Sequence, residues 1–205
     1  MEYLQALESG SSPKIQKAAK AISKKSLSGY CAHLTAALKE QIKNPKSWET
    51  QCELIKAIGK TGCVEVLPLL KDLINKDYES TILYSELAFS ILLIENISES
   101  NIDFLFQSLE KRNVSQIAGA CAALLYRKII PTEEEISQIV SEIVTYTEDE
   151  GHIITPRGYI AAIAYLWPAS TVKDFLESCK KSSSRVISQI AEDSLHGKKS
   201  KFQLI

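Results

Sequence analysis

Apolar residues recur three and four positions apart along most of the chain, which is the spacing of one face of an α-helix. The clearest stretch is 47–95, which predicts three helices separated by a tight turn and a polar loop. No such helix can bury its apolar stripe alone, so we expect neighbouring helices to stack on one another. The three stripes are Trp48, Cys52, Ile55 and Ile58; Val66, Leu67, Leu70 and Leu73; and Leu83, Leu87, Ile91 and Ile94.

The same spacing, with proline, glycine and capping residues as boundaries, predicts about twelve helices and no strand. Gly59 and Gly62 are expected to bracket a turn, and the longest irregular stretch is the loop 147–156. The expected helices cover residues 1–7, 12–25, 31–43, 48–58, 64–75, 82–95, 102–109, 114–126, 132–146, 158–167, 171–179 and 184–195.

Small and apolar residues recur at the end of every second predicted helix. Successive copies are 36, 33, 32, 42 and 27 residues apart, and the widest spacing contains the 147–156 loop. A period of this length in an all-helical chain is typical of stacked helix pairs. The copies are Ala21-Ile22, Ala57-Ile58, Ser90-Ile91, Ala122-Ala123, Ala164-Tyr165 and Ala191.

The stretch 47–95 resembles HEAT-type repeats, and 157–166 and 185–195 are similar to the second helix of such a repeat. In that helix an arginine is followed by alanines at contact positions, as in Arg157 with Ala161 and Ala164. The earlier copies lack the arginine. The resemblance implies an all-α fold, a right-handed α-solenoid of about six HEAT-like helix pairs, with one domain at 1–195 and a basic tail at 196–205. It specifies a fold class and not a function.

The cysteines and the apolar runs of the chain indicate the cellular compartment in which it is expected. The five cysteines are odd in number, are not closely spaced and lie mostly within apolar helix patterns, where a free thiol behaves as a small hydrophobe. Apolar runs are far shorter than the roughly 20 residues of a membrane span, and the first residues lack the features of a signal peptide. We therefore expect a reduced, cytoplasmic protein without a membrane partner.

Chemistry-bearing motifs are scarce, and we expect no enzyme, no catalytic residue, no metal and no cofactor. His33, His152 and His196 form no HxxxH or HExxH pattern, and the pair Cys31 and His33 has no second pair to complete a metal site. The segment 59–62 has a glycine, a lysine and a threonine, but its spacing is not that of a phosphate-binding loop.

The net charge of −1 hides an uneven distribution. Residues 1–60 carry a balance of +5, residues 61–155 carry −10, and residues 156–205 carry +4. The acidic segment is either a solvated face without function or a surface for a basic partner. Aromatic residues on the second helix of each predicted pair are either core residues or, where they project from the surface, anchors for a partner. The candidate partner-binding residues are Glu95, Glu99, Asp103, Glu133, Glu134, Glu135, Glu148, Asp149, Glu150, Tyr84, Tyr126 and Tyr159.

These features favour a non-enzymatic protein-binding chain. Its size and acidic middle are similar to those of bacterial immunity proteins, some of which are helical-repeat proteins that inhibit contact-dependent growth-inhibition toxins. The expected partner is then a basic nuclease domain. The alternatives are a HEAT-like DNA glycosylase and a regulatory adaptor scaffold. The balance of −10 over 61–155 opposes nucleic acid, because phosphate contacts need a continuous positive track.

Overall fold

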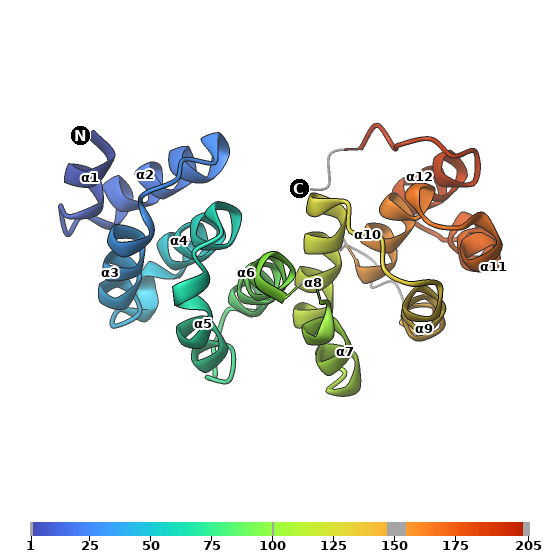
Figure 1. Ribbon diagram of the computed structural model, residues 1–205, viewed down its shortest axis with the longest axis horizontal. Coiled ribbons are helices and arrows are strands. Elements are labelled where there is room, and N and C mark those ends of the chain that lie inside the picture. The colour runs from blue at the N-terminus through green and yellow to red at the C-terminus, as the bar shows by residue number, and fades with distance from the viewer. Residues whose placement is uncertain (1, 100, 147–154, 203–205) are drawn as a thin grey trace. The chain divides into compact units, whose positions relative to one another are not determined.

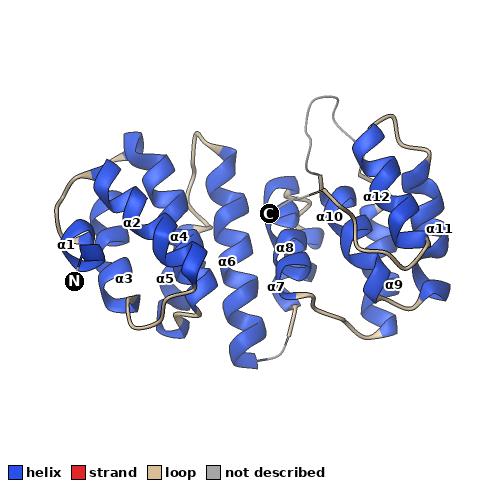
Figure 2. Ribbon diagram, turned by 90° about the horizontal axis from the view of Figure 1, so that it is seen from above, coloured by secondary structure: helices blue, strands red, loops and turns tan. Residues whose placement is uncertain are grey.

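The computed structural model describes residues 2–99, 101–146 and 155–202, and the side chains of residues 98 and 99 are outside this description. The described residues contain helices, turns and loops but no strand (Figure 2), so the all-α prediction is confirmed. No helix within the described ranges is long and apolar enough to cross a membrane.

Twelve α-helices and three short 3₁₀ helices make up the described chain (Figure 1). Their bounds agree with the predicted ones to within a few residues, because the apolar stripes and the caps mark the ends. They are α1 (Glu2–Leu7), α2 (Ser12–Lys25), α3 (Cys31–Gln41), η1 (Pro45–Ser47), α4 (Trp48–Thr61), η2 (Val64–Val66), α5 (Leu67–Leu73), α6 (Thr81–Glu99), α7 (Asp103–Glu110), α8 (Val114–Arg127), α9 (Glu133–Ile143), α10 (Pro156–Ile163), η3 (Ala164–Leu166), α11 (Ala169–Lys180) and α12 (Arg185–Leu195).

The chain forms two compact units, Met1–Phe104 and Leu105–Ile205. In the first unit, α4 packs between α2 and α6, while α3 packs on α4 and α5 packs on α6. In the second unit, α10 packs between α8 and α12, while α11 packs on α12 and α9 packs on α11. Both units therefore place every second helix in one row, as stacked helix pairs do. A single repeat domain over 1–195 stays a prediction.

The predicted stripes form much of the core of the first unit. Leu70, Leu83, Leu87 and Ile91 are buried, in agreement with the pattern. Trp48 differs, because 37% of its surface is exposed. It is the first residue of α4, and its neighbours Thr50 and Gln51 in the same turn are buried.

Gly59 was expected at a turn, and this prediction is wrong. It lies inside α4, which continues to Thr61. Gly62 ends the helix in the left-handed conformation at φ 71°, where glycine has no steric penalty. Gly59 is needed for a different reason, namely the close approach of Ser90 on α6.

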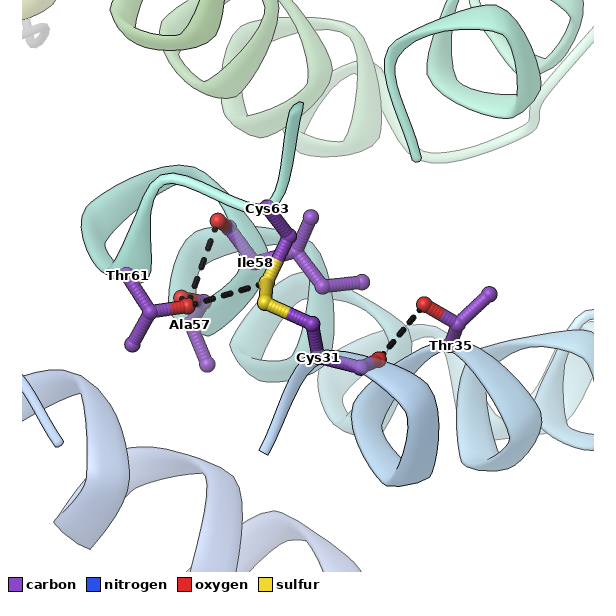
Figure 3. Close-up of a disulfide and its surroundings, with 6 residues drawn as sticks. All are labelled: Cys31, Thr35, Ala57, Ile58, Thr61 and Cys63. Atoms are coloured by element: carbon purple, nitrogen blue, oxygen red, sulfur yellow. Dashed lines mark hydrogen bonds between the residues drawn. A yellow bond between two sulfur atoms is a disulfide. The ribbon is translucent and has the colours of Figure 1, made fainter. Parts of the chain in front are cut away.

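The prediction that all five cysteines are free is also wrong. Cys31, at the start of α3, forms a disulfide with Cys63, which immediately precedes η2 (Figure 3). The two residues are 32 positions apart in sequence, and their Cα atoms are 5.5 Å apart. The other three, Cys52, Cys121 and Cys179, are free and buried. Burial raises the pKa of Cys52 to about 12, so this thiol is neutral and unreactive.

Candidate partner-binding groove

The acidic candidates of the second unit gather at the start of α9. Thr132 and Glu135 form a capping box: the Thr132 hydroxyl oxygen accepts from the Glu135 N–H at 3.3 Å, and a Glu135 carboxylate oxygen accepts from the Thr132 N–H at 2.7 Å. Glu133 and Glu134 are exposed. Negative charge at a helix N-terminus stabilises the helix. The position of these acidic residues is therefore explained without a binding partner.

The acidic candidates of the first unit do not form one exposed surface. Glu95 is buried in α6, and its carboxylate lies 2.6 Å from the Lys71 ammonium group of α5. It therefore holds two helices together. Asp103 is exposed in the first turn of α7, and Glu99 ends α6. The predicted acidic residues Glu148, Asp149 and Glu150 lie outside the described residues.

Tyr84 organises the loop that joins α5 to α6. Its hydroxyl donates to the Lys76 carbonyl at 2.9 Å and accepts from the Tyr78 N–H at 3.1 Å. The rings of Tyr78 and Tyr84 meet edge to face, with their centroids 5.3 Å apart. Burial, together with Tyr84, raises the pKa of Tyr78 to about 12, so Tyr78 stays neutral and its hydroxyl donates to the Leu73 carbonyl at 2.9 Å. The loop is thus fixed by its own aromatic residues.

A second fixed turn faces this loop. Gln51 of α4 is buried, and its side-chain amide donates to the carbonyls of Gln41 and Asn44 at 3.1 and 3.0 Å. The buried Ser47 hydroxyl donates to the same two carbonyls. The turn between α3 and α4 is therefore held against the first turn of α4, where Trp48 is exposed.

The turn and the loop enclose a groove of about 570 Å³, within the usual size range of binding pockets. The half-exposed Trp48 indole lies in this groove, and the polar rim carries Asp77 and Glu79, both exposed. Among the described residues, neither carboxylate has an ion-pair partner. The groove is lined by Ile42, Pro45, Trp48, Gln51, Lys76, Asp77, Tyr78, Glu79, Ser80 and Leu83.

The two other tyrosine candidates belong to the second unit. Tyr126 and Tyr165 line a cavity of about 510 Å³ together with Lys128, Lys199 and Lys201. The cavity lining includes no acidic residue among those described, so it does not suit a basic partner. Tyr159 is half-buried on α10.

Two of the three histidines lie in the described ranges, and each has a local partner. His33 Nδ1 is 3.3 Å from a carboxylate oxygen of Glu8, and His196 Nδ1 is 2.8 Å from the Glu192 carbonyl oxygen. His152 lies outside the described residues. Neither of these two histidines lines the groove.

The sequence interpretation placed Trp48 in the apolar stripe of its helix and expected a polar loop over 76–81, so it did not predict the groove. The candidate Tyr84 fixes this loop but does not line the groove. The local signal for the groove was Tyr78, an aromatic residue between two acidic ones in that loop. The facing turn at 42–47 is about 30 residues away in sequence, so its contribution needed the packing of α4 on α3.

Comparison with known proteins adds no relative: no protein-family model, no curated protein and no solved structure matches this chain.

Proposed function

We propose that this chain is a non-enzymatic protein-binding protein whose groove at Trp48 takes a basic segment of another protein. The observation that carries the proposal is that the half-exposed Trp48 indole lines the same groove as Asp77 and Glu79, whose carboxylates have no ion-pair partner in the part of the chain that the structure describes. Tryptophan is enriched among residues that dominate binding energy at interfaces. An arginine or lysine over an indole, with a carboxylate in reach, gains both cation–π and ionic attraction.

The specific form of the proposal is an immunity protein that binds a basic nuclease toxin and occludes its active site in the cytoplasm. The fold proposed for it is a right-handed α-solenoid of about six HEAT-like pairs. The rows α2–α4–α6 and α8–α10–α12 within the two units support this arrangement. Acidic residues at the groove and at the start of α9 would steer the basic partner during association.

The test uses the full chain immobilised in five forms: the wild type, Trp48→Ala, Asp77→Lys/Glu79→Lys, Glu133→Lys/Glu134→Lys and Ile130→Ala. Ile130 is the matched control, because it is a large apolar residue that is 60% exposed and lies outside the groove. Each form is exposed to lysate of the producing organism, and retained proteins are identified by mass spectrometry and assayed for nuclease activity with and without added chain.

We expect one basic nuclease to be retained by the wild type and by Ile130→Ala, lost by the two groove variants, and inhibited by one equivalent of the chain. Retention of the same proteins by all five forms contradicts the groove assignment. Groove-dependent retention of a protein without nuclease activity contradicts the immunity function and leaves an adaptor.

The Glu133→Lys/Glu134→Lys variant tests whether the acidic residues of α9 contribute. If they steer the partner, its association with this variant should be slower and less sensitive to salt than its association with the wild type.

A further inference from the structure

Cys31, Cys63 and Glu65 form a cluster that the proposed function does not use. One ligand atom from each residue, the two Sγ atoms and a carboxylate oxygen, lies within 4.8 Å of the other two. Cys31 is the first residue of α3, while Cys63 and Glu65 belong to the short connection between α4 and α5. The cluster therefore joins two segments that are 32 residues apart.

Cysteine thiolates and carboxylate oxygens are both zinc ligands, and sites with three protein ligands hold water in the fourth position. A tetrahedral zinc ion with Zn–S bonds of about 2.3 Å and Zn–O bonds of about 2.0 Å separates its ligand atoms by roughly 3.5–3.8 Å. In the disulfide the two Sγ atoms are bonded to each other, so they must move apart to about 3.8 Å after reduction, whereas the Glu65 carboxylate already lies within 4.8 Å of both. The Cα separation of 5.5 Å between the two cysteines is set by the backbone of α3 and of the α4 end, both of which are well packed.

We propose that the disulfide and a zinc ion are alternative occupants of this cluster, and that the redox state of the surroundings selects between them. A dithiol reductant of the thioredoxin class transfers two electrons and two protons to the Cys31–Cys63 disulfide, which gives two thiols and the oxidised reductant. Zn²⁺ then displaces the two thiol protons and binds both thiolates and the Glu65 carboxylate, and water takes the fourth position.

The surroundings of the cluster are consistent with both occupants. Cys63 is fully buried, whereas Cys31 is half-buried and Glu65 is exposed, so a reductant and a metal ion reach the cluster from one side. The Thr61 hydroxyl lies 3.3 Å from the Cys63 Sγ and 2.7 Å from the Ala57 carbonyl oxygen (Figure 3). Once Cys63 is a thiolate, the Thr61 hydroxyl can turn its one proton from the Ala57 carbonyl to the sulfur, as outer-shell partners do at zinc sites.

Either occupant holds the start of α3 against the end of α4. The consequence is that the first unit stays clamped in an oxidising compartment through the disulfide and in a reducing one through the metal. The cysteines therefore do not restrict the chain to one compartment. This inference is independent of the proposed function, because it involves no residue of the groove.

The experiment uses the full chain, treated with a phosphine reductant and a chelator and then desalted. Co²⁺ is added as a spectroscopic probe, and the thiolate-to-cobalt charge-transfer band and the visible bands of tetrahedral cobalt are recorded. Zn²⁺ is then titrated against a chromogenic chelator, and thermal unfolding is followed by circular dichroism. We expect one tetrahedral ion per chain, no band before reduction, and a melting temperature that falls on reduction and recovers with Zn²⁺.

Three variants separate the site from other thiols. Cys31→Ser/Cys63→Ser keeps Cys52, Cys121 and Cys179 and should show no band. Glu65→Gln should weaken zinc binding at least about tenfold, whereas Glu49→Gln, an exposed glutamate of α4, should not. Equal binding by the wild type and the double-serine variant, or no binding by the reduced wild type, overturns the proposal. If reduction unfolds the chain, failure of Zn²⁺ to restore the helical signal overturns it as well.

Discussion

Gly59 of α4 and Ser90 of α6 lie so close together that a methyl group on Gly59 would be 2.5 Å from the Ser90 Oγ and 2.7 Å from its Cα. The Ser90 hydroxyl donates to the Ile55 carbonyl of α4 at 2.8 Å. In the second unit, the buried Ser194 hydroxyl of α12 donates to the Ala161 carbonyl of α10 at 2.6 Å. Each unit thus contains one pair of alternate helices, α4 with α6 and α10 with α12, close enough for a serine to reach the backbone of the other helix.

Gly59→Ala should lower the free energy of unfolding by about 1–3 kcal/mol, because the obstructing atoms include the backbone of Ser90 and α6 must move. The gain of roughly 1 kcal/mol in helix propensity does not offset this. Urea unfolding followed by circular dichroism measures the change. Gly158→Ala is the control, since its nearest atoms would be 3.7 Å away, and it should be neutral or slightly stabilising. Equal stabilities for the two variants would contradict the packing argument.

Much of the fold was predictable because each helix carries its own stripe and its own ends. The stripes of α5 and α6 are local patterns, and proline or glycine marks boundaries such as the start of α2, the end of α4 and the start of α10. The pairing of helices follows from short connections. Gly59 shows the limit of this reasoning: a glycine near a helix end indicates a cap, and only the position of Ser90 reveals that it serves a close contact between helices.

The groove and the disulfide depend on distant parts of the chain. Cys31 and Cys63 each match a helical or turn pattern, and only the packing of α3 on α4 brings them together. Trp48 belongs to the apolar stripe of its helix by spacing, yet 37% of its surface is exposed. A stripe predicts which face is apolar but not which of its residues the neighbouring elements cover, so an exposed anchor residue is indistinguishable from a core residue in sequence.

Thr132→Ala should destabilise the second unit by about 1 kcal/mol, because the variant removes the side-chain acceptor for the Glu135 N–H. Thermal unfolding compares it with Ser11→Ala. Ser11 occupies the same position before α2, but its side chain makes no capping hydrogen bond, so that variant should change stability by a few tenths of a kcal/mol at most. A larger loss for Ser11→Ala than for Thr132→Ala would exclude the capping box as a source of stability.

Glu86 of α6 should make stability depend on pH. Burial raises the pKa of its carboxyl group, and Lys56, 2.8 Å away, opposes this rise; Glu53 and Lys60 also act on the group. Between the ordinary pKa near 4.5 and the raised one, the folded chain binds more protons than the unfolded chain, so stability falls as pH rises through this interval. Urea unfolding from pH 4 to 7 should show this fall in the wild type and not in Glu86→Gln.

The Lys56→Met variant tests the sign of that argument. Removing the ammonium group removes the attraction that lowers the pKa of Glu86, so the fall in stability should be larger and should extend to higher pH. A Lys56→Met curve with the same slope as the wild type would show that the dependence comes from another group.

Trp48 should report the charge of the groove through quenching of its fluorescence. The chain has two tryptophans, and Trp167 is buried with its indole N–H donating to the Ile129 carbonyl, so Trp167→Phe leaves Trp48 as the emitter. If Asp77 and Glu79 dominate the local potential over Lys76, Cs⁺ should be enriched around the indole and I⁻ depleted. A unit charge about 7 Å away in water changes a local ion concentration by roughly twofold to threefold. The ratio of the Cs⁺ to the I⁻ quenching constant should therefore fall by at least about twofold in Asp77→Asn/Glu79→Gln at low ionic strength, and the difference should shrink with added salt.

Acrylamide is the neutral control and should quench both proteins equally, because the substitutions leave the exposure of the indole unchanged. Equal Cs⁺ to I⁻ ratios in the two proteins would show that the carboxylates do not act on Trp48, and the groove would then lack the electrostatic preference for a basic segment.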